Sequence, residues 1–370
     1  IDCYICIVKG KIYTMQSWDI KIIPSRPDIE SRKILKKLPS AHAALAELKG
    51  LASTIPNQNI LINTLGLQEA KDSSAIENIV TTHDELYKSE LNIKTIKSLE
   101  AKEVQNYISA LKRGYDLIRE RSLLTNSIII EIQQILERNR AGFRRLPGTE
   151  LKNARTGEVV YTPPQDSQEI KLLMGELQKM INDPDYSDYD PIVKMAIIHF
   201  QFESIHPFYD GNGRTGRIIN ILYLILNGLL EAPILYLSSY IIRYKGDYYK
   251  YLQQVRTKND WESWLIFMID GVNQTAKETI QTIKEIKAMM QEMKVLLRNN
   301  YKFYSKDLLN NLFKHPYTKI GFVVDDLGVS RLTAANYLNT LADDGILRKE
   351  KVGNSNYYIN IRLFDLLKKK

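Results

Sequence analysis

The chain contains very little cysteine: two residues in 370, Cys3 and Cys6, both within the first six positions. Neither a disulfide framework nor a zinc site follows from them, and so few thiols agree with a reducing cytoplasm, where we place the protein. Residues 1–14 also lack the length and the small-residue cleavage site of a secretion signal. Two interpretations of them stay open: an ordinary first strand, or a stretch in front of a true start at Met15.

The chain also has no internal repeat and no low-complexity tract. The apolar stretch within residues 214–230 is too short to span a bilayer, so we expect no membrane association. A hydrophobic fraction of 44% and a charged fraction of 25% are ordinary for a globular protein, and the length allows two or three domains. The net charge of +8 favours anionic partners such as ATP or nucleic acid without specifying one.

One stretch dominates the sequence: residues 206–217, HPFYDGNGRTGR. Its glycines let backbone N–H groups turn toward an anion, and Arg214 and Arg217 can fork onto phosphate oxygens. Asp210 is a hard oxygen ligand suited to Mg²⁺, and His206 can accept a proton near neutral pH. These residue types at this spacing indicate phosphate chemistry. A plain glycine-rich surface turn would need none of these side chains.

The flanking sequence places the motif between two helices. Asp190 and Pro191 are typical of a helix N-cap and first helical position, and residues 192–205 are strongly apolar without a period of two. Residues 214–230 predict a buried helix, so an anion in the glycine loop would lie at its positive N-terminus. The glycines also match the dinucleotide pattern G-x-G-x-x-G, but that pattern requires a strand before the glycines, and a helix is predicted there. The Walker pattern G-x-x-x-x-G-K-[ST] is absent from the sequence.

Residues 206–217 resemble the signature of Fic-domain proteins, H-P-F-x-D-G-N-G-R-x-x-R, at every defined position. The resemblance implies transfer of AMP from ATP to a protein hydroxyl. It implies that His206 deprotonates the hydroxyl, that Asp210 holds Mg²⁺ and that Phe208 anchors the loop in the core. It also implies a set of nucleotide-binding residues, the last of them in a segment rich in tyrosine and lysine: Gly211, Asn212, Gly213, Arg214, Arg217 and Tyr244.

A second string, SSAIEN from Ser73 to Asn78, lies in a helix that we expect over residues 61–80. Ser73 and Glu77 share a helix face, which on its own suits any solvated helix. Beside a Fic motif, the string resembles the family's inhibitory motif, [ST]-x-x-x-E-[GN]. The resemblance implies that Ser73, Glu77 and Asn78 form an inhibitory element in which Glu77 pairs with Arg217 and keeps it from the γ-phosphate. In some relatives this glutamate supports removal of AMP, so a deAMPylase stays an alternative.

The resemblance implies a mainly α-helical fold: a Fic-type helical bundle with a β-hairpin flap, followed by a C-terminal winged helix. A turn between strand-like runs predicts the hairpin at residues 149–164, where Tyr161 is a candidate self-modification site. We expect His199 to be a packing histidine, and Glu203 either to orient His206 or to be a helix-face carboxylate. We divide the chain into an N-terminal extension (1–30), a helical region with the inhibitory helix (31–110), a catalytic core (111–275), a linker helix (276–300) and a winged-helix domain (301–370).

Together these features predict a cytoplasmic protein adenylyltransferase that uses ATP and Mg²⁺ and modifies a Ser, Thr or Tyr hydroxyl of a protein target, its own chain included. The first alternative is a nucleotide-sensing transcriptional regulator that binds DNA through the winged helix. The expected recognition helix over residues 331–344 offers only Arg331 as a cation and ends in two aspartates, whereas the wing carries Arg348, Lys349 and Lys351. DNA binding and a protein-interaction or homodimer role therefore both stay open for this domain.

Overall fold

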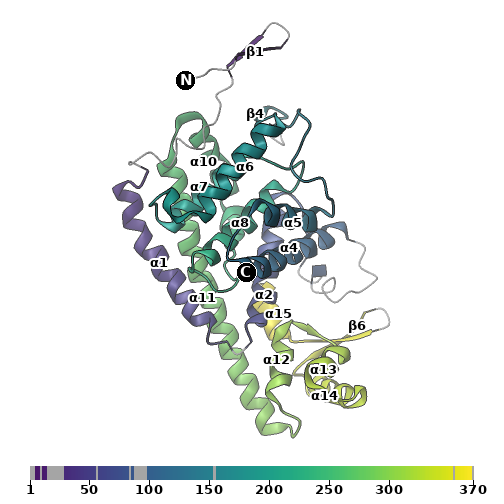
Figure 1. The fold of residues 1–370 in the computed structure, drawn as a ribbon. Helices are drawn as coiled ribbons and strands as arrows, with labels where there is room; N and C mark the ends of the chain where they lie inside the picture. Colours follow the sequence, from purple (N-terminus) through teal and green to yellow (C-terminus); the bar gives the residue numbers. More distant parts are fainter. Residues whose placement is uncertain are drawn as a thin grey trace.

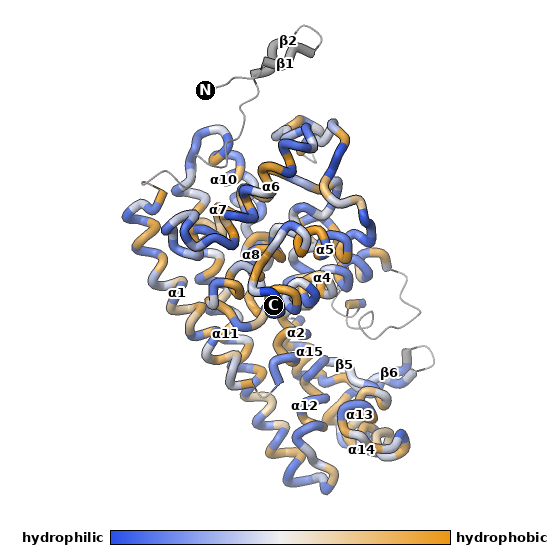
Figure 2. The backbone as a smooth tube through the Cα atoms, in the orientation of Figure 1, coloured by the Kyte–Doolittle hydropathy of each residue, from blue (hydrophilic) through white to orange (hydrophobic). Residues whose placement is uncertain are grey.

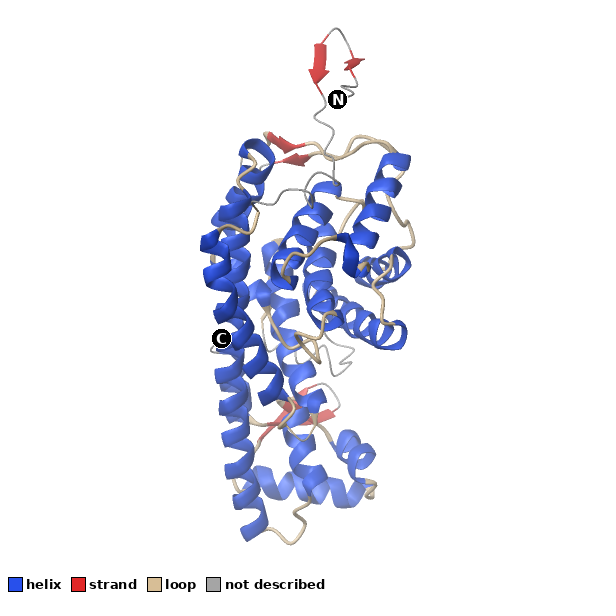
Figure 3. Ribbon diagram, turned by 60° about the vertical axis from the view of Figure 1, so that its left-hand side comes forward, coloured by secondary structure: helices blue, strands red, loops and turns tan. Residues whose placement is uncertain are grey.

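The computed structural model describes residues 5–8, 11–14, 29–55, 57–82, 85–86, 98–152, 156–352 and 355–368. Over these residues the protein is mainly α-helical with a few short strands, which confirms the predicted class (Figure 3). Figure 1 shows a helical bundle joined to a smaller C-terminal unit by one long helix, α11 (Trp261–Asn300). Within the described residues, no helix combines the length and the apolar character that crossing a membrane would need.

Two consecutive helices, α7 (Pro191–Ile205) and α8 (Asn212–Leu226), form the centre of the bundle. The Asp190 side chain accepts the Ile192 amide at 2.8 Å and caps α7, with Pro191 at its first position, as predicted. Every residue of α7 after Pro191 is buried, so this helix has no polar face and lies inside. The helices that pack against the pair include α11 and four others: α2 (Gln58–Ile76), α4 (Leu99–Arg121), α5 (Asn126–Glu137) and α6 (Ser167–Asn182).

The longest helix pair lies on the outside of the bundle, where α1 (Arg32–Ala52) packs lengthwise against α11. Lys37 on α1 contacts Asp270 on α11 at 2.7 Å, and Lys284 reaches back to Glu47 at 2.9 Å. Figure 2 shows both helices alternating between hydrophilic and hydrophobic turns, as amphipathic helices do. The expected linker helix is therefore the second half of α11, because its apolar residues continue at helical spacing. The expected boundary at residues 275–276 falls inside α11, and the division into domains remains a prediction.

The C-terminal unit contains three helices followed by a hairpin and a last helix: α12 (Lys306–Lys314), α13 (Ile320–Leu327), α14 (Arg331–Asp343), β6 (Arg348–Val352), β7 (Ser355–Ile359) and α15 (Ile361–Lys368). A short strand, β5 (Tyr317–Thr318), completes an antiparallel sheet in the order β5-β7-β6. This is the order of elements that the winged-helix prediction requires. The unit docks on α2, where Gln68 Nε2 donates to the Leu367 carbonyl at 2.7 Å.

The expected hairpin is present as β3 (Leu151–Lys152) paired antiparallel with β4 (Val159–Tyr161). The remaining elements are short: β1 (Ile5–Val8), β2 (Lys11–Thr14), η2 (Pro184–Tyr186), α9 (Leu237–Arg243) and α10 (Lys245–Lys258). Two expected helix ends were wrong. The helix expected over residues 61–80 is α2, which ends at Ile76 because Asn78 takes a positive φ of 64°, and α8 ends at Leu226, four residues before the expected end.

Candidate active site

The motif loop connects α7 to α8 and is fixed by its own side chains. The Asn212 amide accepts the Phe208 N–H at 2.9 Å and donates to the Phe208 carbonyl at 2.8 Å. Phe208 is fully buried, with its ring centroid 5.3 Å from that of Phe143, so it is the core anchor that the sequence predicted. The Asn212 side chain is committed to the loop, which leaves its backbone for the nucleotide contact that remains a prediction.

Gly211 and Gly213 present bare backbone at the N-terminal end of α8. Gly211 has a φ of 76°, in the left-handed region that glycine enters without strain. A Cβ on Gly211 would lie 2.3 Å from Glu137 Oε1, and a Cβ on Gly213 would lie 2.3 Å from Glu77 Oε1. The loop therefore has the form of an anion site at a helix N-terminus, and one carboxylate covers each glycine.

His206 ends α7 in the left-handed region, with φ 49° and ψ 58°, and its amide donates to the Phe202 carbonyl at 2.9 Å. Its Nδ1 is buried, and the imidazole interacts with the backbone of Glu203. Burial, followed by the positive charges of Arg144 and Arg256, lowers the pKa of His206 to about 4. The imidazole is therefore neutral at physiological pH and able to accept a proton.

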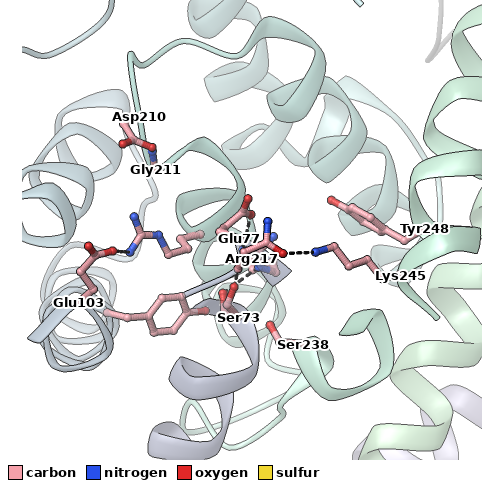
Figure 4. Close-up of polar contacts among 12 residues, drawn as sticks. Ser73, Glu77, Glu103, Asp210, Gly211, Arg217, Ser238, Lys245 and Tyr248 are labelled. Carbon is pink, nitrogen blue, oxygen red and sulfur yellow. Dashed lines mark hydrogen bonds and ion pairs between the residues drawn. The ribbon is translucent and has the colours of Figure 1, made fainter. Parts of the chain in front are cut away.

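Arg217 is buried and makes three polar contacts with the end of α2 (Figure 4). Its Nε donates to Ser73 Oγ at 2.8 Å, and its Nη2 donates to the Ser73 carbonyl at 2.9 Å and to Glu77 Oε1 at 2.8 Å. The contact between Glu77 and Arg217 that the inhibitory motif predicts is thus present. Burial alone would raise the pKa of Glu77, but the Arg217 guanidinium holds it below its ordinary value. We call Ser73, Glu77 and Arg217 the Arg217 cluster.

Asn78 explains why the helix can stop directly behind Glu77. Its φ of 64° lies in the left-handed region, which asparagine tolerates better than most residues and which commonly ends helices. The Ile79 amide then donates to the Ser74 carbonyl at 3.0 Å. Asn78 Oδ1 also accepts a hydrogen bond from Lys245 Nζ at 3.2 Å, which joins the end of α2 to α10.

Arg214 is also buried, and two carboxylates from other helices hold it. Its Nη1 lies 2.9 Å from Glu103 Oε2 on α4, and its Nη2 lies 2.8 Å from Glu137 Oε1, the last residue of α5. We call Glu103, Glu137 and Arg214 the Arg214 cluster. Burial raises the pKa of Glu137; Arg214 opposes this shift, and the nearby negative charges of Asp210, Glu103 and Glu77 add to it.

Asp210, the predicted Mg²⁺ ligand, is exposed at the loop surface. Its Oδ1 accepts the Gly211 amide at 2.7 Å, which leaves the carboxylate otherwise open to solvent. Among the residues that the structure describes, no three or more His, Cys, Asp or Glu side chains gather as a metal site. A single carboxylate combined with substrate phosphates is nevertheless a common Mg²⁺ ligand set, so the role of Asp210 remains a prediction.

Two buried side chains of α7, His199 and Glu203, precede the motif in the sequence. His199 Nε2 pairs with the Tyr248 hydroxyl at 2.8 Å and its Nδ1 with the Asn220 amide at 3.0 Å, which confirms a packing histidine. Burial, and then Arg217, lowers its pKa to about 3. Glu203 is not a solvated helix-face carboxylate: its buried Oε1 has no hydrogen-bond partner among the residues that the structure describes and would lie 2.8 Å from a Cβ on Gly216. Burial raises the pKa of Glu203 to about 7.

Two tyrosines complete the set of predicted residues: Tyr244, expected to contact the adenine, and Tyr161, the candidate self-modification site. Tyr244 is 39% exposed and stands beside Lys245, next to the end of α2, where its nucleotide contact remains a prediction. The Tyr161 hydroxyl donates to the Ser204 carbonyl at 2.9 Å, and Arg256 lies 4.1 Å from the centre of its ring. A hydroxyl already bonded in this way is poorly placed to accept AMP, so the geometry disfavours Tyr161 as a self-modification site.

The sequence alone missed four charged side chains of the site: Glu103, Glu137, Arg144 and Arg256. Glu103, Glu137 and Arg144 lie 62 to 111 positions from their hydrogen-bond partners in the motif, so no local spacing connects them. Only Arg144 had a local signal. It lies in the segment Gly142 to Gly148, which interrupts the helical pattern before the hairpin.

Three family models match the chain. The N-terminal model of the Fic/DOC family matches residues 35–116, the Fic/DOC family model matches residues 123–224, and the model of the C-terminal domain of SoFic-like protein adenylyltransferases matches residues 289–363. The second match contains the motif loop, and the first contains the Ser73–Asn78 string. The chain therefore belongs to the Fic/DOC family.

Curated relatives match at modest identity. A probable protein adenylyltransferase of Aquifex aeolicus, aq_aa38, is 28% identical over 182 residues, which are 49% of this chain and 54% of that protein. The protein adenylyltransferase fic-1 of Caenorhabditis elegans is 29% identical over 135 residues, 34% of this chain and 26% of that protein. The chain thus spans about half the length of the first relative and about a quarter of the second.

Solved structures share the fold. A Fic family protein from Desulfovibrio desulfuricans G20 superposes with a TM-score of 0.54 at 21% identity, covering 87% of this chain and 95% of that chain. A fragment of Fic-1 from C. elegans gives 0.54 at 21% identity, covering 68% and 72%. At these identities the likeness establishes the fold, and it confirms the mainly helical Fic-type bundle.

Proposed function

We propose that the chain is a protein adenylyltransferase, which transfers AMP from Mg·ATP to a Ser, Thr or Tyr hydroxyl of a protein. The observation that carries the proposal is the layout of the motif loop. A neutral histidine ends α7, and a bare glycine loop begins α8 a few residues later. A base for a hydroxyl and a cradle for phosphates therefore share one short connection. The names of the curated relatives support the same activity.

In this proposal His206 takes the proton of the attacking hydroxyl. The hydroxyl oxygen forms a bond to the α-phosphorus of ATP while the bond from that phosphorus to the β-phosphate oxygen breaks, and pyrophosphate leaves. Backbone N–H groups of Gly211, Asn212 and Gly213 bind the α- and β-phosphates, and Arg214 and Arg217 bind the outer phosphates. Positioning and neutralisation of charge are the main contributions that such a transfer needs.

The residues at the loop suit Mg²⁺, with Asp210 as the ligand from the protein. Three carboxylates, those of Glu103, Glu137 and Asp210, lie around the single guanidinium of Arg214, which supports an excess of negative charge at this side of the loop. A divalent cation would relieve that excess. When bound, Mg²⁺ would supply positive charge to the phosphates and fix their orientation. Tyr244 would contact the adenine from the start of α10.

We further propose that Glu77 restrains the activity. Its carboxylate occupies the space over Gly213, where the backbone of the loop would receive a phosphate, and it holds Arg217. Two anions cannot share that space without a large electrostatic cost. Productive binding of ATP therefore requires Glu77 to move, and Ser73 and Asn78 determine how firmly it stays.

The first experiment compares wild type, Glu77→Gly and the double variant Glu77→Gly/His206→Ala. Each is incubated with Mg²⁺ and ATP labelled either at the α- or at the γ-phosphate. We expect label from the α-phosphate alone, on protein, in the single variant, and its loss in the double variant and with EDTA. Label from the γ-phosphate would instead indicate phosphorylation. Equal silence of wild type and Glu77→Gly would contradict the restraint.

The same material separates the two alternatives. A deAMPylase that uses Glu77 would release AMP from protein labelled beforehand, in wild type more than in Glu77→Gly. A nucleotide-sensing regulator would bind ATP without labelling protein and would retain a DNA duplex in a gel shift that resists added salt. The exposed Asp343 and Asp344 at the end of α14 work against that outcome.

A further inference from the structure

Arg144 lies at the junction of the motif loop and the flap. It is 1% exposed, on the segment between α5 and β3. Its Nε donates to the His206 carbonyl at 2.8 Å, and its backbone amide donates to the Pro207 carbonyl at 2.8 Å. Its Nη2 donates to the carbonyl of Pro164 and, at 3.5 Å, to that of Ile205. One side chain therefore binds both the end of α7 and the chain behind β4.

These contacts stabilise the unfavourable backbone conformation of His206, the proposed general base. His206 has a positive φ without being glycine, and carbonyls at the C-terminal end of α7 lack partners within the helix. A cation is favourable at that end, and the Arg144 guanidinium supplies donors to the carbonyls of Ile205 and His206 in one plane. A lysine would keep the charge but not the fork.

The flap is tied to the same end of α7 by a second set of contacts. The Tyr161 hydroxyl binds the Ser204 carbonyl at 2.9 Å, and Gln253 Nε2 on α10 donates to the Val160 carbonyl at 3.2 Å. The hairpin strand is thus held from residue 160 through Pro164. The distance between β4 and His206 is fixed by side chains on both sides, and Arg144 is the one that contacts His206 itself.

We propose that Arg144 is a positioning residue, which fixes the flap and the backbone of His206 in one geometry so that a target hydroxyl carried by the flap meets the base. The inference rests on the proposed function, because it assigns His206 to a protein hydroxyl. It adds a residue outside the motif to the parts that the transfer needs. The hydrogen bonds of the Arg144 side chain go to the carbonyls of His206, Pro164 and Ile205 and not to the glycines of the phosphate loop, so we expect binding of ATP not to depend on it.

The positive charge of Arg144 also acts on the imidazole of His206 and lowers its pKa. The charged groups that act on His206 are Arg144 from the segment after α5, Arg256 from α10 and Glu77 at the end of α2, and a hydrogen bond to the Glu203 backbone favours the imidazolium. Removing Arg144 removes a cation that disfavours the imidazolium. The pKa of His206 then rises, and the acid limb of a rate–pH profile moves to higher pH.

The test uses the full chain with Glu77→Gly as the parent and adds Arg144→Lys, Arg144→Gln or Arg145→Gln. The matched control is Arg145, an exposed arginine next in the chain, since its replacement makes the same change of charge. Three quantities are measured: self-labelling from α-labelled ATP at saturating ATP between pH 5 and 9, the Kd for a non-hydrolysable ATP analogue, and the Tm.

We expect Arg144→Lys to slow labelling by about tenfold or more, since small misplacements of reacting groups carry such costs, with the Kd for the analogue unchanged. Arg144→Gln should slow labelling at least as much and move the acid limb upward, and Arg145→Gln should match the parent. Two outcomes would overturn the positioning role and leave the proposed function standing. One is labelling by Arg144→Lys at the parent's rate, and the other is a loss of rate accompanied by an equal loss of ATP affinity and Tm. No label in the parent overturns the proposed function and this role with it.

Discussion

The two arginines of the motif loop, Arg214 and Arg217, stand three positions apart on α8, and each is buried against carboxylates from other helices. In both clusters one carboxylate lies at the C-terminal end of its helix: Glu77 follows α2, and Glu137 is the last residue of α5. The helix dipole disfavours a negative charge at that end. Each of these carboxylates therefore depends on its arginine.

The clusters differ in the balance of charge. Arg217 faces one carboxylate and the neutral Ser73, and the pKa of Glu77 is held low by Arg217 in spite of burial. Arg214 faces two carboxylates with Asp210 nearby, and the pKa of Glu137 is raised, first by burial. The Arg217 cluster is a matched ion pair, and its lowered pKa keeps Glu77 ionised at physiological pH. The Arg214 cluster has two carboxylates for one guanidinium, a surplus of negative charge that, in the proposed function, Mg·ATP would relieve.

The largest effect should come from Glu77→Gln, which breaks the matched pair while keeping the size of the side chain. The neutral amide removes the anion over Gly213 and frees Arg217 for phosphate. We expect ATP to bind at least about tenfold more tightly, equivalent to about 1.4 kcal/mol. Calorimetry with a non-hydrolysable ATP analogue measures this, and an unchanged Kd would show that Glu77 does not compete with phosphate.

A smaller effect should follow Ser73→Ala, which leaves the ion pair and removes the hydroxyl that accepts Arg217 Nε. Loss of one such hydrogen bond weakens the cluster by about 1 kcal/mol. We expect AMP transfer by the otherwise unchanged chain to rise several-fold over wild type, but to stay below that of Glu77→Gly. Activity equal to wild type would mean that Glu77 alone closes the site.

Glu137→Gln tests the other side of the comparison and should change less. Arg214 keeps Glu103, and burial together with Asp210 already raises the pKa of Glu137, so its charge contributes little net attraction. At saturating Mg²⁺ we expect the Kd for the ATP analogue to change by less than about threefold. A gain as large as that of Glu77→Gln would show that both clusters restrain nucleotide binding alike.

Glu203 sharpens the comparison because it is a buried carboxylate, and its Oε1 has no hydrogen-bond partner within the described part of the chain. Burial raises its pKa from 4.5 to about 7, so the folded protein binds a proton more tightly than the unfolded chain. The stability that this protonation provides is present below pH 4.5 and is lost as the pH rises to about 7. The Tm of Glu203→Gln relative to wild type should therefore increase over that range and then level off. A pH-independent difference in thermal melts would refute the shift.

The sequence determined the parts of the site that lie close together in the chain. Asp190 and Pro191 begin α7, the glycines open the start of α8, and the twelve motif residues place His206 at the junction of the two helices. Each of these features follows from local backbone preferences, so residue type and spacing were enough to predict them. The pairing of Glu77 with Arg217 was predicted only because the Ser73–Asn78 string resembles a known motif.

Only the tertiary structure decided which charges surround the loop. Glu103 and Glu137 reach Arg214 from two other helices, and Arg144 reaches His206 across 62 positions of chain. Nothing local marks Glu103 or Glu137, and Arg144 is marked only by the break in helical pattern around it, because a long-range contact depends on where two elements pack and not on their own sequence. The burial of Glu203 had the same origin: its place in the sequence left open whether it orients His206 or lies on a solvated helix face, and the packing of α7 against α8 removes it from water and changes its pKa.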